Sequence, residues 1–240
     1  MPQGFRYVPF NDINALRESI GPHTCAVMLE PVQGEGGVHV ADKAYLEGVR
    51  ALCDELGLLL IFDEVQCGLG RTGKLFAYEH HGVEPDIFTL AKALGGGFPI
   101  GAMIGRANVS PSFVPGDHAS TFGGNPLASA AGLAVLEQLL HHGVVENAAS
   151  VGSYLKEQLE KLQEKWDFIV QVRGKGLLLG MELSIPGKDV VAGCQEAGLL
   201  INCVNNNVLR FIPPLIITQE DADFAIQTLD KVLAEVSHGG

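Results

Sequence analysis

An aspartate and a lysine, Asp63 and Lys92, each stand directly after an apolar run in the first half of the chain. Asp63 follows the run Leu58–Phe62, whereas Lys92 follows Ile87–Ala91 and precedes the glycine cluster Gly95–Gly97. Apolar runs of this length are typical of buried parallel strands. Because ligands of open α/β sheets bind outside the carboxyl ends of the strands, we expect both side chains at one ligand-binding edge. The plain structural alternatives are an aspartate that caps a turn and a solvated lysine.

A third candidate is Arg210, which lies inside the apolar strand pattern Val208–Ile212. Burying a guanidinium is costly unless an anion accompanies it. A guanidinium also binds a carboxylate through two parallel hydrogen bonds. The pattern therefore indicates a carboxylate-binding arginine, and an arginine on an exposed strand face is the alternative.

The segments around these residues resemble the class III (fold type I) pyridoxal-phosphate aminotransferases, and within them the acetylornithine and ornithine aminotransferases. The matching segments read IFDEVQ, GLGRTG and TLAKALGGGFPIGA, in this order. The resemblance implies an α/β protein of the PLP-dependent transferase fold type I. It covers the later part of the large parallel-sheet domain and the C-terminal small α+β domain.

The cofactor that the resemblance implies is pyridoxal 5′-phosphate. This cofactor needs a lysine amine for a Schiff base and an acid against its pyridine nitrogen, so Lys92 and Asp63 are the candidates. The freed Lys92 would then act as general acid and base. The resemblance further implies that Val65 packs on the ring and that Gln66 hydrogen-bonds its phenolic oxygen. No metal is expected, because the histidine pairs lack metal-ligand spacing.

Two further segments resemble family motifs. EPVQGEGG, which begins at Glu30, implies Glu35 as a substrate-binding residue, whereas a turn with solvated acids is the alternative. STFGGNP implies that Ser120 and Thr121 bind the cofactor, with Thr121 reaching across a dimer interface to the phosphate in the other subunit. An ST-turn or a helix N-cap is the structural alternative.

Glu35 and Arg210 together predict a switch between two amino donors. Acetylornithine presents a terminal amine remote from its carboxylate, whereas glutamate presents an amine beside one. The resemblance to the family's RFxPPL segment makes Arg210 the clamp for the α-carboxylate. We expect Glu35, in a glycine-rich loop with room to move, to pair with Arg210 in one half-reaction and swing away in the other.

Periodicity and turn residues predict the elements that must position these side chains. An amphipathic helix over 42–56 between apolar runs indicates a βαβ unit and a parallel sheet. After Gly143 we expect helices over 144–165, 188–197 and 221–236, the last capped at Thr218, and strands over 169–172, 177–183 and 208–212. The predicted domains are a partial PLP-binding large domain over 1–142 and a small domain over 143–240.

Bulk properties restrict the partners and the compartment. The net charge of −12 disfavours nucleic acid and anionic membranes. No apolar run approaches the roughly 18 residues of a membrane span. The five cysteines include no CxxC pair, which predicts free thiols and a cytoplasmic location.

A nicotinamide dinucleotide-binding domain is the main competing interpretation, because Gly68–Gly73 reads GxGxxG after a strand. A dinucleotide fingerprint turns directly into a helix and is followed by an acid at the end of the next strand. Here Asp63 and Glu64 precede the glycines, and Asp86 precedes its strand. The sequence therefore favours the aminotransferase.

The predicted function is transfer of the terminal amino group of N2-acetylornithine to 2-oxoglutarate, a step of arginine biosynthesis. The expected partners are small amino acids and 2-oxo acids, and a second copy of the chain in a homodimer with shared active sites. Because the resemblance covers only the later part of the family pattern, we expect an N-terminally truncated chain. The alternatives are an ornithine, succinylornithine or 4-aminobutyrate aminotransferase, or a non-catalytic fragment.

Overall fold

The computed structural model describes residues 3–238, so the start of the N-terminal segment lies outside the described residues. The chain divides into two compact units. Unit 1 comprises the residues up to Pro31, Ala41–Val65 and Tyr78–Leu133. Unit 2 comprises Val32–Val40, Gln66–Ala77 and the residues from Ala134 onward. Two short segments of the first half thus pack with the second half, and a domain boundary near residue 142 stays a prediction.

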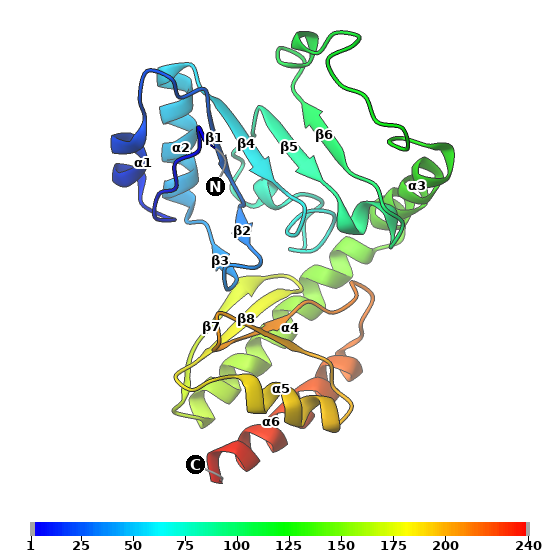
Figure 1. Cartoon of the computed structure of the whole chain (residues 1–240). Helices are drawn as coiled ribbons and strands as arrows, with labels where there is room; N and C mark the ends of the chain where they lie inside the picture. Colours follow the sequence, from blue (N-terminus) through cyan, green and yellow to red (C-terminus); the bar gives the residue numbers. More distant parts are fainter. Residues whose placement is uncertain (1–2, 239–240) are drawn as a thin grey trace. The chain divides into compact units, whose positions relative to one another are not determined.

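Unit 1 is built on a four-stranded sheet in the order β1-β4-β5-β6 (Figure 1). β1 (Ala26–Leu29), β4 (Leu59–Asp63) and β5 (Ile87–Leu90) are parallel, as the sequence predicts. β6 (Ala102–Gly105) runs antiparallel to β5. The connection between β5 and β6 contains only the 3₁₀ turn η2 (Lys92–Gly95), which is too short for the crossover that a parallel strand requires.

Helix α2 (Lys43–Leu56) supplies the crossover from β1 to β4 and covers one face of the sheet. Its five buried residues are Tyr45, Leu46, Val49, Leu52 and Cys53, and they pack with Leu60 and Phe62 of β4. The helix ends at Gly57 with φ +67°, a left-handed cap that glycine adopts without strain. Asp42 stands at the N-cap, but its side chain accepts no capping hydrogen bond.

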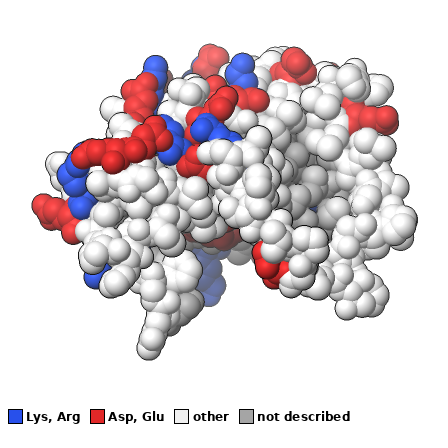
Figure 2. All heavy atoms as spheres, turned by 90° about the horizontal axis from the view of Figure 1, so that it is seen from above, with Lys and Arg blue, Asp and Glu red and all other residues white. Residues whose placement is uncertain are grey.

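Shorter elements complete unit 1. Helix α1 (Ile13–Ser19) begins at Asp12, whose side chain accepts hydrogen bonds from the backbone N–H groups of Asn14 and Ala15. The 3₁₀ turns are η1 (Ala77–His80) and η3 (Ser110–Ser112), and helix α3 (Pro126–His141) runs from unit 1 into unit 2. Between residues 107 and 136, Asp117 is the only Asp, Glu, Lys or Arg side chain. Figure 2 shows charged side chains gathered over one part of the surface beside a broad uncharged area.

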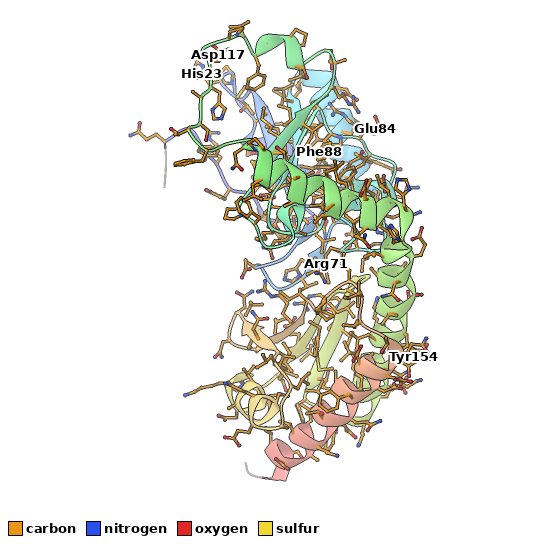
Figure 3. All side chains as sticks on the ribbon, turned by 90° about the vertical axis from the view of Figure 1, so that its right-hand side faces the viewer. His23, Arg71, Glu84, Phe88, Asp117 and Tyr154 are labelled. Atoms are coloured by element: carbon orange, nitrogen blue, oxygen red, sulfur yellow. The ribbon has the colours of Figure 1, made fainter. Side chains whose placement is uncertain are left out.

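Unit 2 contains an antiparallel sheet in the order β7-β8-β10-β9. Its strands are β7 (Ile169–Lys175), β8 (Leu178–Leu183), β9 (Asn202–Val204) and β10 (Val208–Phe211), and its helices are α4 (Val144–Lys165), α5 (Lys188–Glu196) and α6 (Gln219–His238). Leucines, Met181 and Phe211 fill the core between the sheet and the helices. The side chain of Tyr154 on α4 donates a 2.5 Å hydrogen bond to Asp223 on α6 (Figure 3).

A two-stranded hairpin, β2 (Val32–Gln33) and β3 (His39–Val40), also belongs to unit 2. Val38 in this hairpin is fully buried with Cys67 and Leu178. The sequence predicts this stretch only as a loop, because strands of two residues have no readable alternation. Over residues 3–238, no helix has both the length and the apolar character that crossing a membrane requires.

Candidate functional site

The carboxyl edge of the unit 1 sheet brings the predicted aspartate and lysine to neighbouring strands. Asp63 is the last residue of β4 and is in register with Thr89 of β5. Lys92 follows three residues after Thr89 and is the first residue of η2. Asp63 is half-buried and Lys92 is exposed. The Oδ1 atom of Asp63 accepts a hydrogen bond from the backbone N–H of Val65 at 2.9 Å, which orients the carboxylate in the turn after the strand.

The backbone at Lys92 is unusual, because its φ is +45° in the left-handed region. Residues other than glycine rarely adopt this backbone conformation outside strained or functional positions. The turn that begins at Lys92 closes at Gly96 with φ +58°, and Gly97 has φ +107°. Gly96 and Gly97 thus supply the positive φ values that this turn requires.

Glu64, beside Asp63, has a different role in the same turn. Its side chain is 1% exposed, and its Oε1 atom accepts a hydrogen bond from the backbone N–H of Tyr78 at 2.9 Å. Its backbone N–H donates to the carbonyl oxygen of Thr89 at 3.1 Å. Glu64 therefore stabilises the fold of the edge, and of the two acids Asp63 is the one with an accessible carboxylate.

Ser120 and Thr121 are exposed in the loop before α3. The hydroxyl of Ser120 accepts a hydrogen bond from the backbone N–H of Gly123 at 3.0 Å, which is a local contact between side chain and backbone. Within the described part of the chain, neither hydroxyl hydrogen-bonds Asp63 or Lys92. Both hydroxyl groups are therefore accessible, but neither forms a hydrogen bond with the two candidate cofactor residues at the ends of β4 and β5.

In unit 2, the predicted substrate residues form an ion pair. Arg210 on β10 is 6% exposed, and its Nη1 atom donates to Oε1 of Glu35 at 2.8 Å. Its Nε atom donates to Oδ1 of Asn202 at 3.3 Å. The buried guanidinium thus has the acidic partner that burial of a charge requires.

Gln66 is the first residue of the second short segment of unit 2, next to Gly34. A Cβ atom added to Gly34 would lie 2.3 Å from the side-chain oxygen of Gln66, so a side chain at position 34 would displace the Gln66 amide from this position. Asp63, Val65, Lys92, Ser120 and Thr121 belong to unit 1, whereas Glu35, Gln66 and Arg210 belong to unit 2.

Sequence reasoning misses two residues that contact the loop carrying Glu35. The Nε atom of Arg173 donates to the carbonyl oxygen of Gly37 at 2.9 Å, and Nδ2 of Asn205 donates to that of Gly36 at 2.8 Å. The available signals were the RGKGL segment and the run Asn205–Asn207, in which the first two asparagines have positive φ. Neither signal indicates that the side chain donates to a backbone carbonyl group.

The GxGxxG segment is a structural part of unit 2. Nη1 of Arg71 donates to the carbonyl oxygens of Leu177 at 3.0 Å and Pro213 at 2.5 Å. Burial lowers the pKa of Arg71, which is labelled in Figure 3, to about 10. A Cβ atom added to Gly73 would lie 2.8 Å from Cα of Ala149 on α4. Gly73 therefore packs against the backbone of α4, and the GxGxxG segment does not open a helix as a dinucleotide-binding turn does.

Comparisons with known proteins identify the family of the chain. The family model described as "Aminotransferase class-III" matches residues 6–233. An acetylornithine aminotransferase of Methanocaldococcus jannaschii is 55% identical over 239 residues, which are 98% of this chain and 59% of that protein. An acetylornithine aminotransferase of Caldanaerobacter subterraneus is 56% identical over 234 residues, 97% of this chain and 59% of that protein. The chain thus spans less than two thirds of the length of these relatives.

Solved structures give the same result. The ornithine aminotransferase from Toxoplasma gondii has a TM-score of 0.94 and 40% identity, and the match covers 100% of this chain and 58% of that one. The acetylornithine aminotransferase from Elizabethkingia anophelis has a TM-score of 0.91 and 39% identity, with 97% and 60% covered. The fold, the residue order along it and these matches agree that the chain belongs to the class III aminotransferases.

Proposed function

We propose that this chain belongs to a pyridoxal-phosphate-dependent transaminase that moves the terminal amino group of N2-acetylornithine to 2-oxoglutarate. The names of relatives at 55% and 56% identity support this amino donor. The observation that carries the proposal is the ion pair between Glu35 and Arg210, because it joins a buried carboxylate-binding group to an acid that can release it.

The residues at the unit 1 edge fit pyridoxal phosphate. Asp63 offers an accessible carboxylate for a protonated pyridine nitrogen, and Lys92 offers an amine. When bound, the cofactor supplies an electron sink for the carbanion at the substrate carbon. Asp63 would hold the proton at the ring nitrogen, and the Nζ atom of Lys92 would move the proton at the substrate carbon. We assign packing on the ring to Val65 and a hydrogen bond to its phenolic oxygen to Gln66.

The same proposal assigns the phosphate of the cofactor to Ser120 and Thr121, with Thr121 acting across the interface of a homodimer. Their exposure in a loop supports this role, because both hydroxyls are accessible to a second copy. All five cysteines are free thiols, which supports a reducing, cytoplasmic compartment.

Glu35 and Arg210 would let unit 2 accept two kinds of substrate. While the terminal amine of acetylornithine reacts, no α-carboxylate reaches the arginine, and Glu35 neutralises the buried guanidinium. When glutamate or 2-oxoglutarate reacts, Glu35 turns away and the guanidinium takes the α-carboxylate through two hydrogen bonds. Small dicarboxylic 2-oxo acids are therefore the proposed acceptors.

Single-turnover kinetics test this assignment. The enzyme for the test is a chimera that adds to this chain the part of the Methanocaldococcus jannaschii relative that the chain does not match. Arg210→Lys should slow the glutamate half-reaction about 10- to 100-fold, because a point charge cannot replace the two-pronged contact. Glu35→Gln should favour glutamate over acetylornithine. Equal slowing of both half-reactions by both substitutions would show that the pair is only structural.

A further inference from the structure

The turn that carries Glu35 has a backbone that the chain must hold in place. Gly37 has φ +108° and Val38 has φ +57°. A β-branched residue in the left-handed region is strained, and such strain persists only where surrounding contacts enforce it. Val38 is fully buried, and a Cβ atom added to Gly180 of β8 would lie 3.0 Å from Cβ of Val38. The side chain of Val38 therefore packs directly on the bare backbone of β8.

Two side chains from separate elements hold the carbonyl groups of this turn. Arg173 on β7 donates to Gly37 O at 2.9 Å, and Asn205, between β9 and β10, donates to Gly36 O at 2.8 Å. These are the two carbonyl oxygens that directly follow Glu35. Arg173 is itself 9% exposed and is fixed by an ion pair with Glu182 at 2.5 Å. The backbone after Glu35 is therefore held by strand β7 and by the turn between β9 and β10.

This anchoring matters because the side chain of Glu35 is 67% exposed, whereas that of Arg210 is 7% exposed. An exposed carboxylate gains little from an ion pair when it must also lose the freedom of a mobile loop. We propose that Arg173 and Asn205 are positioning residues, which hold the β2–β3 turn so that Glu35 covers Arg210. The proposal rests on the proposed function, in which Arg210 receives a substrate carboxylate. It also limits the switch to the side chain of Glu35, because the backbone of the turn is held.

Asn205→Gly is the variant of choice, because glycine tolerates the φ of +51° at this position and removes the side-chain amide that donates to Gly36 O. Asn206→Gly is the matched control. Asn206 has φ +69°, and its side chain makes no hydrogen bond to any residue between 3 and 238. Both substitutions, made in the whole chain, therefore raise the backbone entropy of the unfolded state by a similar amount. Only Asn205→Gly also removes the hydrogen bond to Gly36 O.

The first measurement is the coupling between Glu35→Gln and Arg210→Gln, obtained from urea unfolding of both single variants and the double variant. In the wild-type background we expect a coupling of about two- to fivefold in the folding equilibrium constant. The coupling should disappear in the Asn205→Gly background and persist in the Asn206→Gly background. A purely structural asparagine would lower the stability of all four proteins equally and leave the coupling unchanged, which would overturn the proposal.

The second measurement leaves Arg210 intact and uses glutarate as the probe, followed through the Arg210 Nε–H signal in ¹⁵N-arginine-labelled chain. Asn205→Gly should tighten glutarate binding about two- to threefold, because the competing Glu35 is no longer held in place. The double variant with Glu35→Gln should bind no better than Glu35→Gln alone. If Glu35→Gln tightens binding and Asn205→Gly does not, the positioning role is wrong. If Glu35→Gln has no effect while the coupling depends on Asn205, the positioning role stands and the proposed carboxylate role of Arg210 fails.

Discussion

Lys92 combines a strained φ of +45°, an exposed side chain and a position at the end of β5. We expect it to be the lysine that sodium borohydride links to pyridoxal phosphate, as read by peptide mass mapping. Lys74, which is also exposed, is the control and should remain unlabelled. Label on Lys74 or another lysine, with Lys92 unmodified, would contradict the assignment of Lys92 as the cofactor lysine.

Asp86 links pH to the stability of unit 1. Burial would raise its pKa, but hydrogen bonds from the backbone N–H of Leu60 and from Arg50 outweigh this and lower the pKa below its ordinary value. A lowered pKa in the folded state means that the stabilisation is present above the unfolded pKa of about 3.9 and is lost as the pH falls below it. Asp86→Asn should therefore cost about 2 kcal/mol at pH 7 and progressively less below about pH 4.

Urea unfolding at pH 7 and at pH 3 measures how much Asp86→Asn lowers the free energy of unfolding. Glu84→Gln is the matched control, because the side chain of Glu84 is 68% exposed and pairs only at the surface with Arg106. It should change the free energy of unfolding by less than about 0.5 kcal/mol. An Asp86→Asn penalty that stayed the same at pH 3 would show that the carboxylate charge is not the cause.

Single residues differ in how far the sequence determines them. The motif resemblance predicts that Glu35 pairs with Arg210, and Nη1 of Arg210 lies 2.8 Å from Oε1 of Glu35. The contact of Asn205 with Gly36, 169 positions away in the chain, did not follow. Its acceptor is a backbone carbonyl, which every residue possesses, so no pattern of residue types marks it. The roles of Asp63, Lys92 and the two hydroxyl residues remain predictions.

At the scale of elements, the long helices were predictable because periodicity and caps coincide. Helix α4 covers Val144–Lys165, as predicted, and α6 begins with a reciprocal contact between Thr218 and Asp221. The sequence did not predict the short strands β2, β3 and β9, because two or three residues are too few to show the alternation of apolar and polar residues that indicates a strand. The antiparallel direction of β6 depends on its connection to β5 rather than on its own residues.

The packing of the β2–β3 hairpin on β8 can be tested with Gly180→Ala. The new methyl group would lie 3.0 Å from Cβ of Val38, which is buried and cannot rotate away. We expect a loss of about 1–3 kcal/mol in urea unfolding. Gly21→Ala is the control, because nothing lies within 4 Å of the added atom and the substitution should be nearly neutral. Equal stability of both variants would show that the hairpin can move away from β8 at little cost.

At the scale of the whole molecule, the unit 1 sheet has accessible apolar residues on its outer strands. Met28 on β1 is 54% exposed and Met103 on β6 is 50% exposed, and the register places both on one face. Because exposed apolar faces and outer strands favour association, we expect light scattering per unit mass of protein to rise with protein concentration. Met28→Gln combined with Met103→Gln should lower it severalfold.

A double substitution in unit 2 controls for hydrophobicity as such. Leu200 and Ile216 are 83% and 73% exposed. Leu200→Gln with Ile216→Gln should leave the scattering unchanged, because neither residue lies in a strand. An equal decrease in both double variants would show that association is not specific to the sheet of unit 1.

The discontinuity of unit 2 has a consequence for the order of folding. Arg71 meets Pro213 across 142 positions, and Glu35 meets Arg210 across 175. The segments of unit 1 are complete once Leu133 has been synthesised, so unit 1 can form while the rest of the chain is still on the ribosome. Segments 32–40 and 66–77 must wait for strands made much later, and closing such long loops is slow. A nascent chain halted at residue 170 would therefore hold the Glu35 turn before Arg173, Asn205 and Arg210 have been made. The ion pair between Glu35 and Arg210 is therefore among the last contacts to form during synthesis.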